Sequence, residues 1–93
     1  MKKIIKSLSF ITSSNSCINE LNKTFSVKLN VSSNQGDIIE LLQPVLDKHY
    51  QNKYTIFEDY QDDYPYIHVL FFVPLTQEHE NNRNVYTDWY TSQ

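Results

Sequence analysis

The sequence predicts an α+β domain in which a small antiparallel sheet packs against one main helix. Apolar residues make up 40% of the 93-residue chain, which is enough for one hydrophobic core. Segments with two-residue apolar periodicity flank one segment with helical periodicity, and the last two strand-like segments are joined by a short polar turn. We therefore expect about four strands in the order β-β-α-β-β, in a single compact domain over residues 1–93.

The N-terminal segment is expected to be the first strand. Ile4, Leu8 and Phe10 share one face of an extended chain, although Ile4, Leu8 and Ile11 also fit a helical stripe. Ile, Phe, Ser and Thr dominate the segment and no helix cap precedes it, which favours a strand.

The same segment has the outline of a secretory signal, with lysines ahead of an apolar run. Lys6 and Ser7 interrupt this run before it reaches the roughly 7–15 apolar residues that such signals contain. Cys17 is the only cysteine, which excludes an intramolecular disulfide and fits a reducing compartment. No stretch approaches the roughly 18 apolar residues of a membrane span. The expected location is the cytoplasm, or the host cytoplasm if the protein is encoded by a phage.

Residues 24–32 show the clearest two-residue alternation. Their apolar side chains are Phe25, Val27, Leu29 and Val31. The pattern predicts a second, half-buried strand. The preceding polar residues are expected to form a connection, with one helical turn that carries Cys17, Ile18 and Leu21.

Residues 36–50 form the predicted helix, because apolar residues recur there at intervals of three and four. Asn34 is a candidate N-cap, and the Asp37 carboxylate suits the positive helix start. Pro44 donates no hydrogen bond and its ring crowds the carbonyl group of Glu40, so the helix is expected to kink or break there.

Residues 53–59 and 65–73 read as two strands of a hairpin, with a polar turn from Tyr60 to Tyr64. The second strand is apolar on both faces, which predicts a central position in the sheet. Residues 75–93 are expected to form a loosely docked C-terminal tail that regains helical spacing near Trp89.

Charge divides the chain into two parts. Residues 1–36 hold five lysines against one glutamate, whereas residues 37–93 hold ten acidic residues against two lysines and one arginine. All seven tyrosines lie in the later part. The surface that this protein offers a partner is therefore expected to be acidic and aromatic.

Several kinds of chemistry have no support in the sequence. Gly36 is the only glycine, which excludes the glycine-rich loops that cradle phosphates. Three histidines are present, but neither His49 nor His68 has a second ligand at a spacing that lets one element present both to a metal. Glu78, His79 and Glu80 are the only locally dense set of ligand residues, and in a strand the two glutamates would face away from His79. We expect no cofactor, no metal site and no enzymatic activity. A small metal-dependent hydrolase stays open as an alternative, with these residues as its set: Glu58, Asp59, Asp62, Asp63 and His79.

The aromatic strand at 65–73 also raises the possibility of nucleic-acid stacking. Stacking platforms lie in basic surroundings that hold phosphates, whereas four acidic residues precede this strand. Direct nucleic-acid binding is therefore not expected, and neither is membrane binding. A homodimer stays open, because a strand with two apolar faces can also form a dimer edge.

Tyrosine and tryptophan next to carboxylates are typical of protein interfaces with a basic partner. The function predicted from the sequence is a non-enzymatic inhibitor that blocks a basic, nucleic-acid-handling protein or complex, such as an anti-CRISPR or anti-restriction protein of a phage or mobile element. An immunity protein that neutralises a toxin nuclease is the alternative with the same surface chemistry. The predicted binding residues are Glu58, Asp59, Tyr60, Asp62, Asp63, Tyr64, Tyr86, Asp88, Trp89 and Tyr90.

Overall fold

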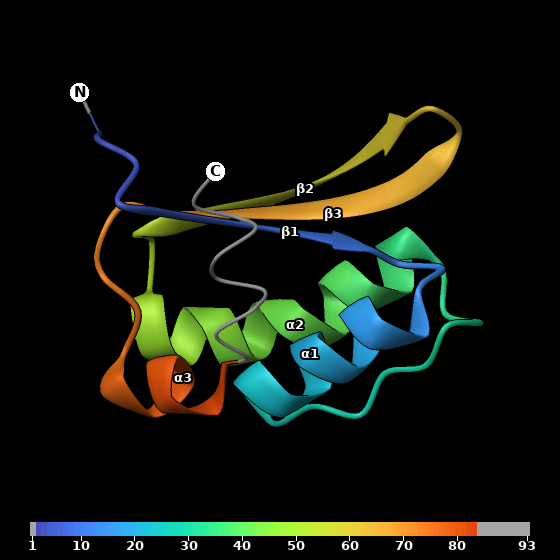
Figure 1. Cartoon of the computed structure of the whole chain (residues 1–93). Coiled ribbons are helices and arrows are strands. Elements are labelled where there is room, and N and C mark those ends of the chain that lie inside the picture. Colours follow the sequence, from blue (N-terminus) through green and yellow to red (C-terminus); the bar gives the residue numbers. More distant parts are fainter. Residues whose placement is uncertain (1, 84–93) are drawn as a thin grey trace.

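The computed structural model describes residues 2–83, which form three strands and three helices. Their order and bounds are β1 (Lys6–Ile11), α1 (Asn15–Phe25), α2 (Gln35–Tyr50), β2 (Tyr54–Gln61), β3 (Tyr64–Phe71) and α3 (Gln77–Asn82). The strands form one antiparallel sheet in the order β1-β3-β2. Helices α1 and α2 form a second layer under one face of this sheet (Figure 1). The α+β class is confirmed, whereas the expected four strands and single main helix are matched only in part.

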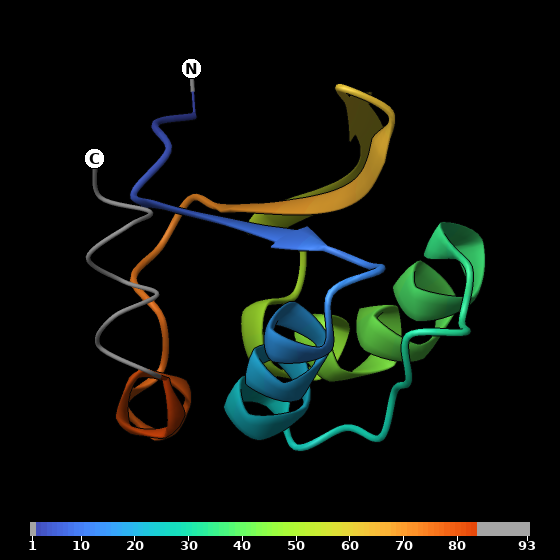
Figure 2. The same ribbon diagram turned by 45° about the vertical axis from the view of Figure 1, so that its right-hand side comes forward.

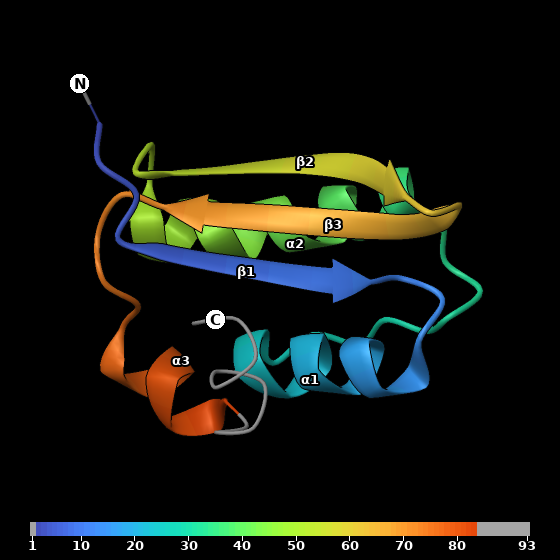
Figure 3. The same ribbon diagram turned by 45° about the horizontal axis from the view of Figure 1, so that its top comes forward.

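The central position of β3 is confirmed, because it pairs with β1 on one side and with β2 on the other. Its residues Ile67, Val69 and Phe71 are fully buried and point toward the helices. The alternate residues of β3 point to the opposite face, which none of the described helices covers (Figure 3). This uncovered side is called the open face below.

The N-terminal strand is also confirmed, as β1. Leu8 and Phe10 are buried and pair with Val69 and Ile67 of β3. Ile4 lies ahead of the strand and is half exposed. The alternative helical reading of this segment is therefore wrong.

The predicted main helix is confirmed as α2. The Asn34 side chain caps it by accepting a hydrogen bond of 2.8 Å from the backbone N–H of Asp37. The helix does not break at Pro44, which lies inside it. Pro44 and Glu40 are both exposed, so water can reach the carbonyl group that lacks an N–H partner.

The strand predicted at 24–32 is wrong. The polar connection before it is a full helix, α1, which extends to Phe25 and ends at Ser26 in the left-handed conformation. Ser14 caps its start by accepting from the N–H of Cys17. The buried residues Ile18, Leu21 and Phe25 recur at helical spacing. Phe25 is therefore the last residue of a helix, and the apolar residues that alternate after it lie in a loop.

In the loop after α1, one side chain forms the backbone hydrogen bonds that a neighbouring strand would form. The amide of Asn22 donates to the carbonyl oxygen of Leu29 at 2.9 Å and accepts from its N–H at 2.8 Å. These are the two hydrogen bonds that a neighbouring strand would provide. Leu29 is thereby held in the core at 7% exposure, whereas Val31 is 41% exposed.

The hydrophobic core lies between the sheet and the helices. Its largest contributions come from β1, β3, α1 and α2, and its members are Leu8, Phe10, Ile18, Leu21, Phe25, Leu29, Ile38, Leu42, Leu46, Tyr50, Ile67, Val69, Phe71 and Leu75. Among residues 2–83 no helix is both long enough and apolar enough to cross a membrane. The predicted tail begins within this part of the chain with buried Leu75 and α3, while its remainder from residue 84 lies outside the described residues.

Candidate functional site

The hairpin of β2 and β3 is confirmed, with a tighter turn than the sequence predicts. Its strands pair as far as Gln61 and Tyr64, so the turn consists of Asp62 and Asp63 alone. Both residues have positive φ angles, of 51° and 67°. Two-residue hairpin turns of the I′ type require this geometry, which glycine and asparagine adopt more readily than aspartate.

The end of the hairpin carries large exposed apolar groups beside its acids. Tyr60 is 65% exposed, Tyr64 57% and Phe57 42%. Glu58, Asp62 and Asp63 are exposed, and Asp59 is partly buried. We call the following set the hairpin surface: Phe57, Glu58, Asp59, Tyr60, Asp62, Asp63, Tyr64 and Tyr66. The other predicted binding residues, Tyr86, Asp88, Trp89 and Tyr90, lie outside the described residues.

The hairpin surface has two sides. Strand register places four residues of the hairpin surface on the open face. Tyr64 and Tyr66 alternate with His68 along β3, while Phe57 pairs with His68 and Asp59 pairs with Tyr66. Tyr60 pairs with Pro65 and points to the helix side. Figure 2 shows that this end of the hairpin bends away from the helix layer. Both sides of the hairpin end are therefore accessible.

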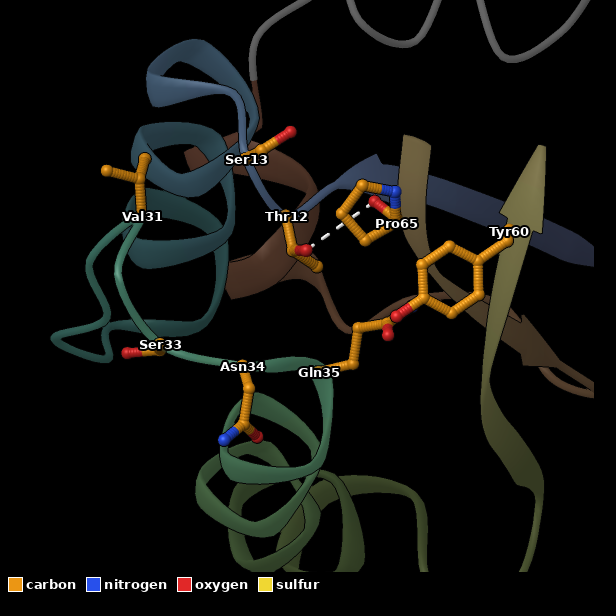
Figure 4. Close-up of a pocket in the computed structure, with 8 residues that line it drawn as sticks. All are labelled: Thr12, Ser13, Val31, Ser33, Asn34, Gln35, Tyr60 and Pro65. Atoms are coloured by element: carbon orange, nitrogen blue, oxygen red, sulfur yellow. Dashed lines mark hydrogen bonds between the residues drawn. The ribbon is translucent and has the colours of Figure 1, made fainter. Parts of the chain in front are cut away.

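A pocket lies on the helix side, between the hairpin and the start of α2 (Figure 4). Its volume is about 210 Å³, and Tyr60 forms one wall. Gln35 lines the pocket and its side-chain amide donates to the carbonyl oxygens of Asp59 and Tyr66 at 2.9 and 3.0 Å. These two bonds fasten the start of α2 to the bent hairpin and fix the shape of the pocket.

On the open face, polar side chains form a hydrogen-bonded row across all three strands. Ser9 Oγ lies 2.8 Å from Nδ1 of His68, and His68 Nε2 lies 3.1 Å from Oδ2 of Asp59. Hydrogen bonds from the Gln61 amide, the His68 ring and the Tyr60 N–H hold the pKa of Asp59 below its usual range. We call Ser9, His68 and Asp59 the polar row. Tyr66 stacks on His68 with a ring separation of 5.6 Å, and Phe57 packs against His68 at 5.1 Å.

A serine, a histidine and an aspartate in a row raise the question of nucleophilic catalysis. When Nε2–H of His68 donates to Asp59, Nδ1 accepts from the Ser9 hydroxyl group, as a general base would. Acyl transfer also needs N–H donors that converge on the developing oxyanion. The backbone N–H groups of a strand lie in the plane of the sheet, whereas Ser9 Oγ stands above it. Within residues 2–83, the strand backbone around Ser9 therefore directs no pair of N–H donors above the sheet, and the interactions shown for the polar row are those that order the open face.

The structure does not assemble the residues of the hydrolase alternative. The acidic hairpin turn lies at one end of the sheet, whereas α3, which contains His79, lies on the helix side near the opposite end (Figures 1 and 3). Glu80, also in α3, is paired with Arg83, which donates to its two carboxylate oxygens at 3.0 and 3.2 Å. The acids of the hairpin and His79 thus belong to different parts of the molecule.

Instead, His79 lies beside His49, a pairing that the sequence analysis missed. The two rings are 4.7 Å apart, and the side chains of His49, Glu78 and His79 offer ligand atoms within 4.8 Å of one another. Burial, followed by the neighbouring charge of His49, lowers the pKa of His79. Two signals were present in the sequence: His49 falls on the apolar stripe of the predicted helix, and Glu78, His79 and Glu80 form a locally dense set of ligand residues. The packing of α3 against the end of α2, which brings His79 to His49, could not be predicted from either.

The strained turn provides a test of the hairpin geometry. Asp63→Gly is expected to raise the free energy of unfolding by about 0.5–1 kcal/mol, because glycine adopts positive φ without a steric cost. Gln43→Gly is the matched control. Gln43 is exposed within α2, where glycine costs about 1 kcal/mol, so this variant is expected to be less stable. Urea unfolding measures both, and a loss of stability in Asp63→Gly would contradict the turn geometry.

Comparison of the chain with protein-family models, with curated protein sequences and with solved structures finds no match. The function therefore has to be argued from the geometry of the hairpin surface and its surroundings.

Proposed function

We propose that the protein is a non-enzymatic binding module that inhibits a basic, nucleic-acid-handling protein by docking its hairpin surface. The observation that carries this proposal is the exposure of three large aromatic side chains, Phe57, Tyr60 and Tyr64, at one bent end of the sheet. Aromatic groups of this size are the usual anchors of protein interfaces, because their burial contributes large apolar area and freezes few rotors.

The charge around these aromatic groups selects the class of partner. The turn and the end of β2 carry Glu58, Asp59, Asp62 and Asp63, while residues 54–82 contain no lysine or arginine. A cationic protein surface complements this field and is attracted to it over long range. The same field repels nucleic acid, so the exposed aromatic rings are assigned to protein contacts and not to base stacking.

The order of the open face supports tight binding. The polar row holds His68 between Ser9 and Asp59, and His68 in turn packs against Tyr66 and Phe57. Side chains that are already fixed lose less conformational entropy when a partner covers them. On the helix side, the pocket beside Tyr60 can accept one side chain of the partner while the open face contacts the rest.

The narrower proposal is an anti-defence protein of a phage or mobile element, aimed at a CRISPR or restriction complex. Such complexes expose cationic grooves for nucleic acid, and an acidic domain can occupy a groove of this kind by competing with phosphate groups. The scarcity of glycine and alanine, whose codons are rich in G and C, indicates an AT-rich gene, which agrees with a phage or mobile element of a low-GC bacterium.

Co-purification from a host that expresses the chain tests the proposal. The wild-type protein is compared with the triple variant Asp59→Asn, Asp62→Asn and Asp63→Asn, each as bait at the same concentration. Asp62 and Asp63 are exposed turn carboxylates, which contribute little to stability, and asparagine tolerates their positive φ angles. Asp59→Asn keeps a side-chain oxygen that can accept from Nε2–H of His68, so the triple variant is expected to remain folded. We expect the wild type, in low-salt buffer, to retain a basic protein whose nucleic-acid binding it inhibits, and the triple variant to retain less of it, because the hairpin acids act mainly through long-range attraction. Equal retention of that protein by both would contradict the proposal.

A further inference from the structure

The strongest feature outside the hairpin surface is the group formed by His49, Glu78 and His79, called the histidine cluster here. His49 belongs to the last turn of α2, whereas Glu78 and His79 belong to the first turn of α3. Their ligand atoms lie within 4.8 Å of one another. Two imidazoles and a carboxylate from two separate helices are the donor set of many three-ligand zinc sites.

The position of His79 is fixed by its surroundings. The ring is 1% exposed and packs edge-on against Phe25 of α1 at 5.0 Å. Its Nδ1 atom forms a hydrogen bond of 2.5 Å with the hydroxyl group of Tyr50, and this hydroxyl also accepts from the N–H of Thr76 at 3.2 Å. Nε2 is therefore the nitrogen that can bind a metal without breaking the bond to Tyr50. A ligand histidine whose other nitrogen is held by a neighbouring group is the usual arrangement around protein-bound zinc.

We propose that the histidine cluster binds Zn²⁺ through His49, Glu78 and His79, with Tyr50 as the positioning residue for His79. Three protein ligands leave the fourth tetrahedral position to a water molecule. The mixed nitrogen and oxygen donors select zinc over magnesium and calcium, which prefer oxygen ligands alone.

The geometry requires little movement to close around the ion. Ligand atoms of tetrahedral zinc lie about 3.4 Å apart, given metal–ligand distances of about 2.1 Å. Glu78 is exposed and His49 lies outside the buried core, so side-chain rotation can shorten the present separations while His79 stays in place. Metal binding would tie α3 to the end of α2, and it does not involve the hairpin surface at the far end of the sheet.

The test uses the 93-residue chain without an affinity tag, titrated with ZnCl₂ by calorimetry. The variants are His49→Ala and Glu78→Gln, both at accessible positions, and His68→Ala is the matched control because its imidazole lies on the open face of the sheet. We expect one zinc ion per wild-type chain. His49→Ala should weaken binding by about 100-fold or more and Glu78→Gln by about 10-fold or more, since even outer partners of zinc ligands contribute 10- to 100-fold.

The His68→Ala variant is expected to bind zinc as the wild type does. A second readout follows thermal unfolding, in which zinc should raise the midpoint temperature of the wild type and of His68→Ala and leave that of His49→Ala unchanged. Absence of zinc binding by the wild type at 1 mM would overturn the proposal. Unchanged affinity in His49→Ala would overturn it equally, because His79 would then serve only as a packed core residue.

Discussion

Leu29→Asp is expected to abolish cooperative folding or to lower the free energy of unfolding by more than about 4 kcal/mol. Leu29 is 7% exposed and belongs to the core cluster, although it lies in a loop. An aspartate there would place an unpaired charge next to apolar side chains, one of the few mechanisms that gives losses of this size. The side chain of Asn22 bonds both the N–H and the carbonyl group of Leu29, which fixes the backbone of this residue. The Leu29 side chain therefore cannot turn outward without breaking these hydrogen bonds.

Val31→Asp is the matched control for this variant. A strand over 24–32 would place Val31 on the same buried face as Leu29, and both substitutions would then unfold the protein. In the structure Val31 is 41% exposed, so Val31→Asp is expected to change stability by no more than about 0.5 kcal/mol. Thermal unfolding followed by circular dichroism distinguishes the two cases. Equal losses from both variants would restore the strand and contradict the loop.

Tyr64→Ala is expected to weaken the complex with the partner by about 30-fold or more, mostly through faster dissociation. Tyr64 is 57% exposed and lies at the end of the open face, where a partner would desolvate it. Truncation of a central aromatic anchor costs about 2 kcal/mol or more, and such losses appear mainly in the dissociation rate. Tyr60→Ala, on the helix side, tests whether the partner also fills the adjoining pocket.

Leu41→Ala is the control for the aromatic variants. Leu41 is an exposed apolar residue of α2, at 54%, and lies in the helix layer away from the open face. Its truncation is expected to leave the affinity unchanged. Surface plasmon resonance with the captured partner gives both rate constants. A loss of affinity in Leu41→Ala as large as that in Tyr64→Ala would place the interface on the helices instead.

The sequence predicts those elements whose local pattern agrees with their environment. In β3 one face is fully buried and the other is packed by aromatic neighbours, and a run of residues that is apolar on both faces is the expected pattern for such a strand. In α2 the cap at Asn34 and the buried stripe of Ile38, Leu42 and Leu46 agree with each other. Pro44 violates the helical pattern, yet it lies on the exposed side where the lost hydrogen bond costs least.

The prediction failed where a nearby side chain, and not a neighbouring strand, satisfied the backbone groups of the chain. The alternation from Phe25 to Val31 has the period of a strand, but the hydrogen bonds of a strand come from the side chain of Asn22. Periodicity of apolar residues reports which side chains are buried and not which groups satisfy the backbone. The same limit reduced α1 to one predicted turn, because Phe25 was assigned to the strand instead of to the helical series of Ile18 and Leu21.

The candidate site likewise has a part that could be predicted from the sequence and a part that could not. The acidic and aromatic composition of the hairpin end could be predicted, because a turn between two strands places its residues at the surface. The polar row could not be predicted, because Ser9, His68 and Asp59 meet only through the pairing of β1 and β2 with β3. The histidine cluster was hidden for a similar reason, since α3 brings His79 to the end of α2.

The most direct test of the acidic hairpin surface is the salt dependence of the association rate with the captured partner. The wild type and the triple variant of Asp59, Asp62 and Asp63 to asparagine are compared at several salt concentrations, with a folded thermal transition required of both. The Debye length shortens from about 30 Å at 0.01 M salt to about 8 Å at 0.15 M, so steering by the hairpin acids should be strong only at low salt. We predict that the wild type associates at least 10-fold faster than the variant at 0.01 M and that this difference largely disappears at 0.15 M. Equal association rates at low salt would contradict the assignment of the hairpin surface as the docking site for a basic partner.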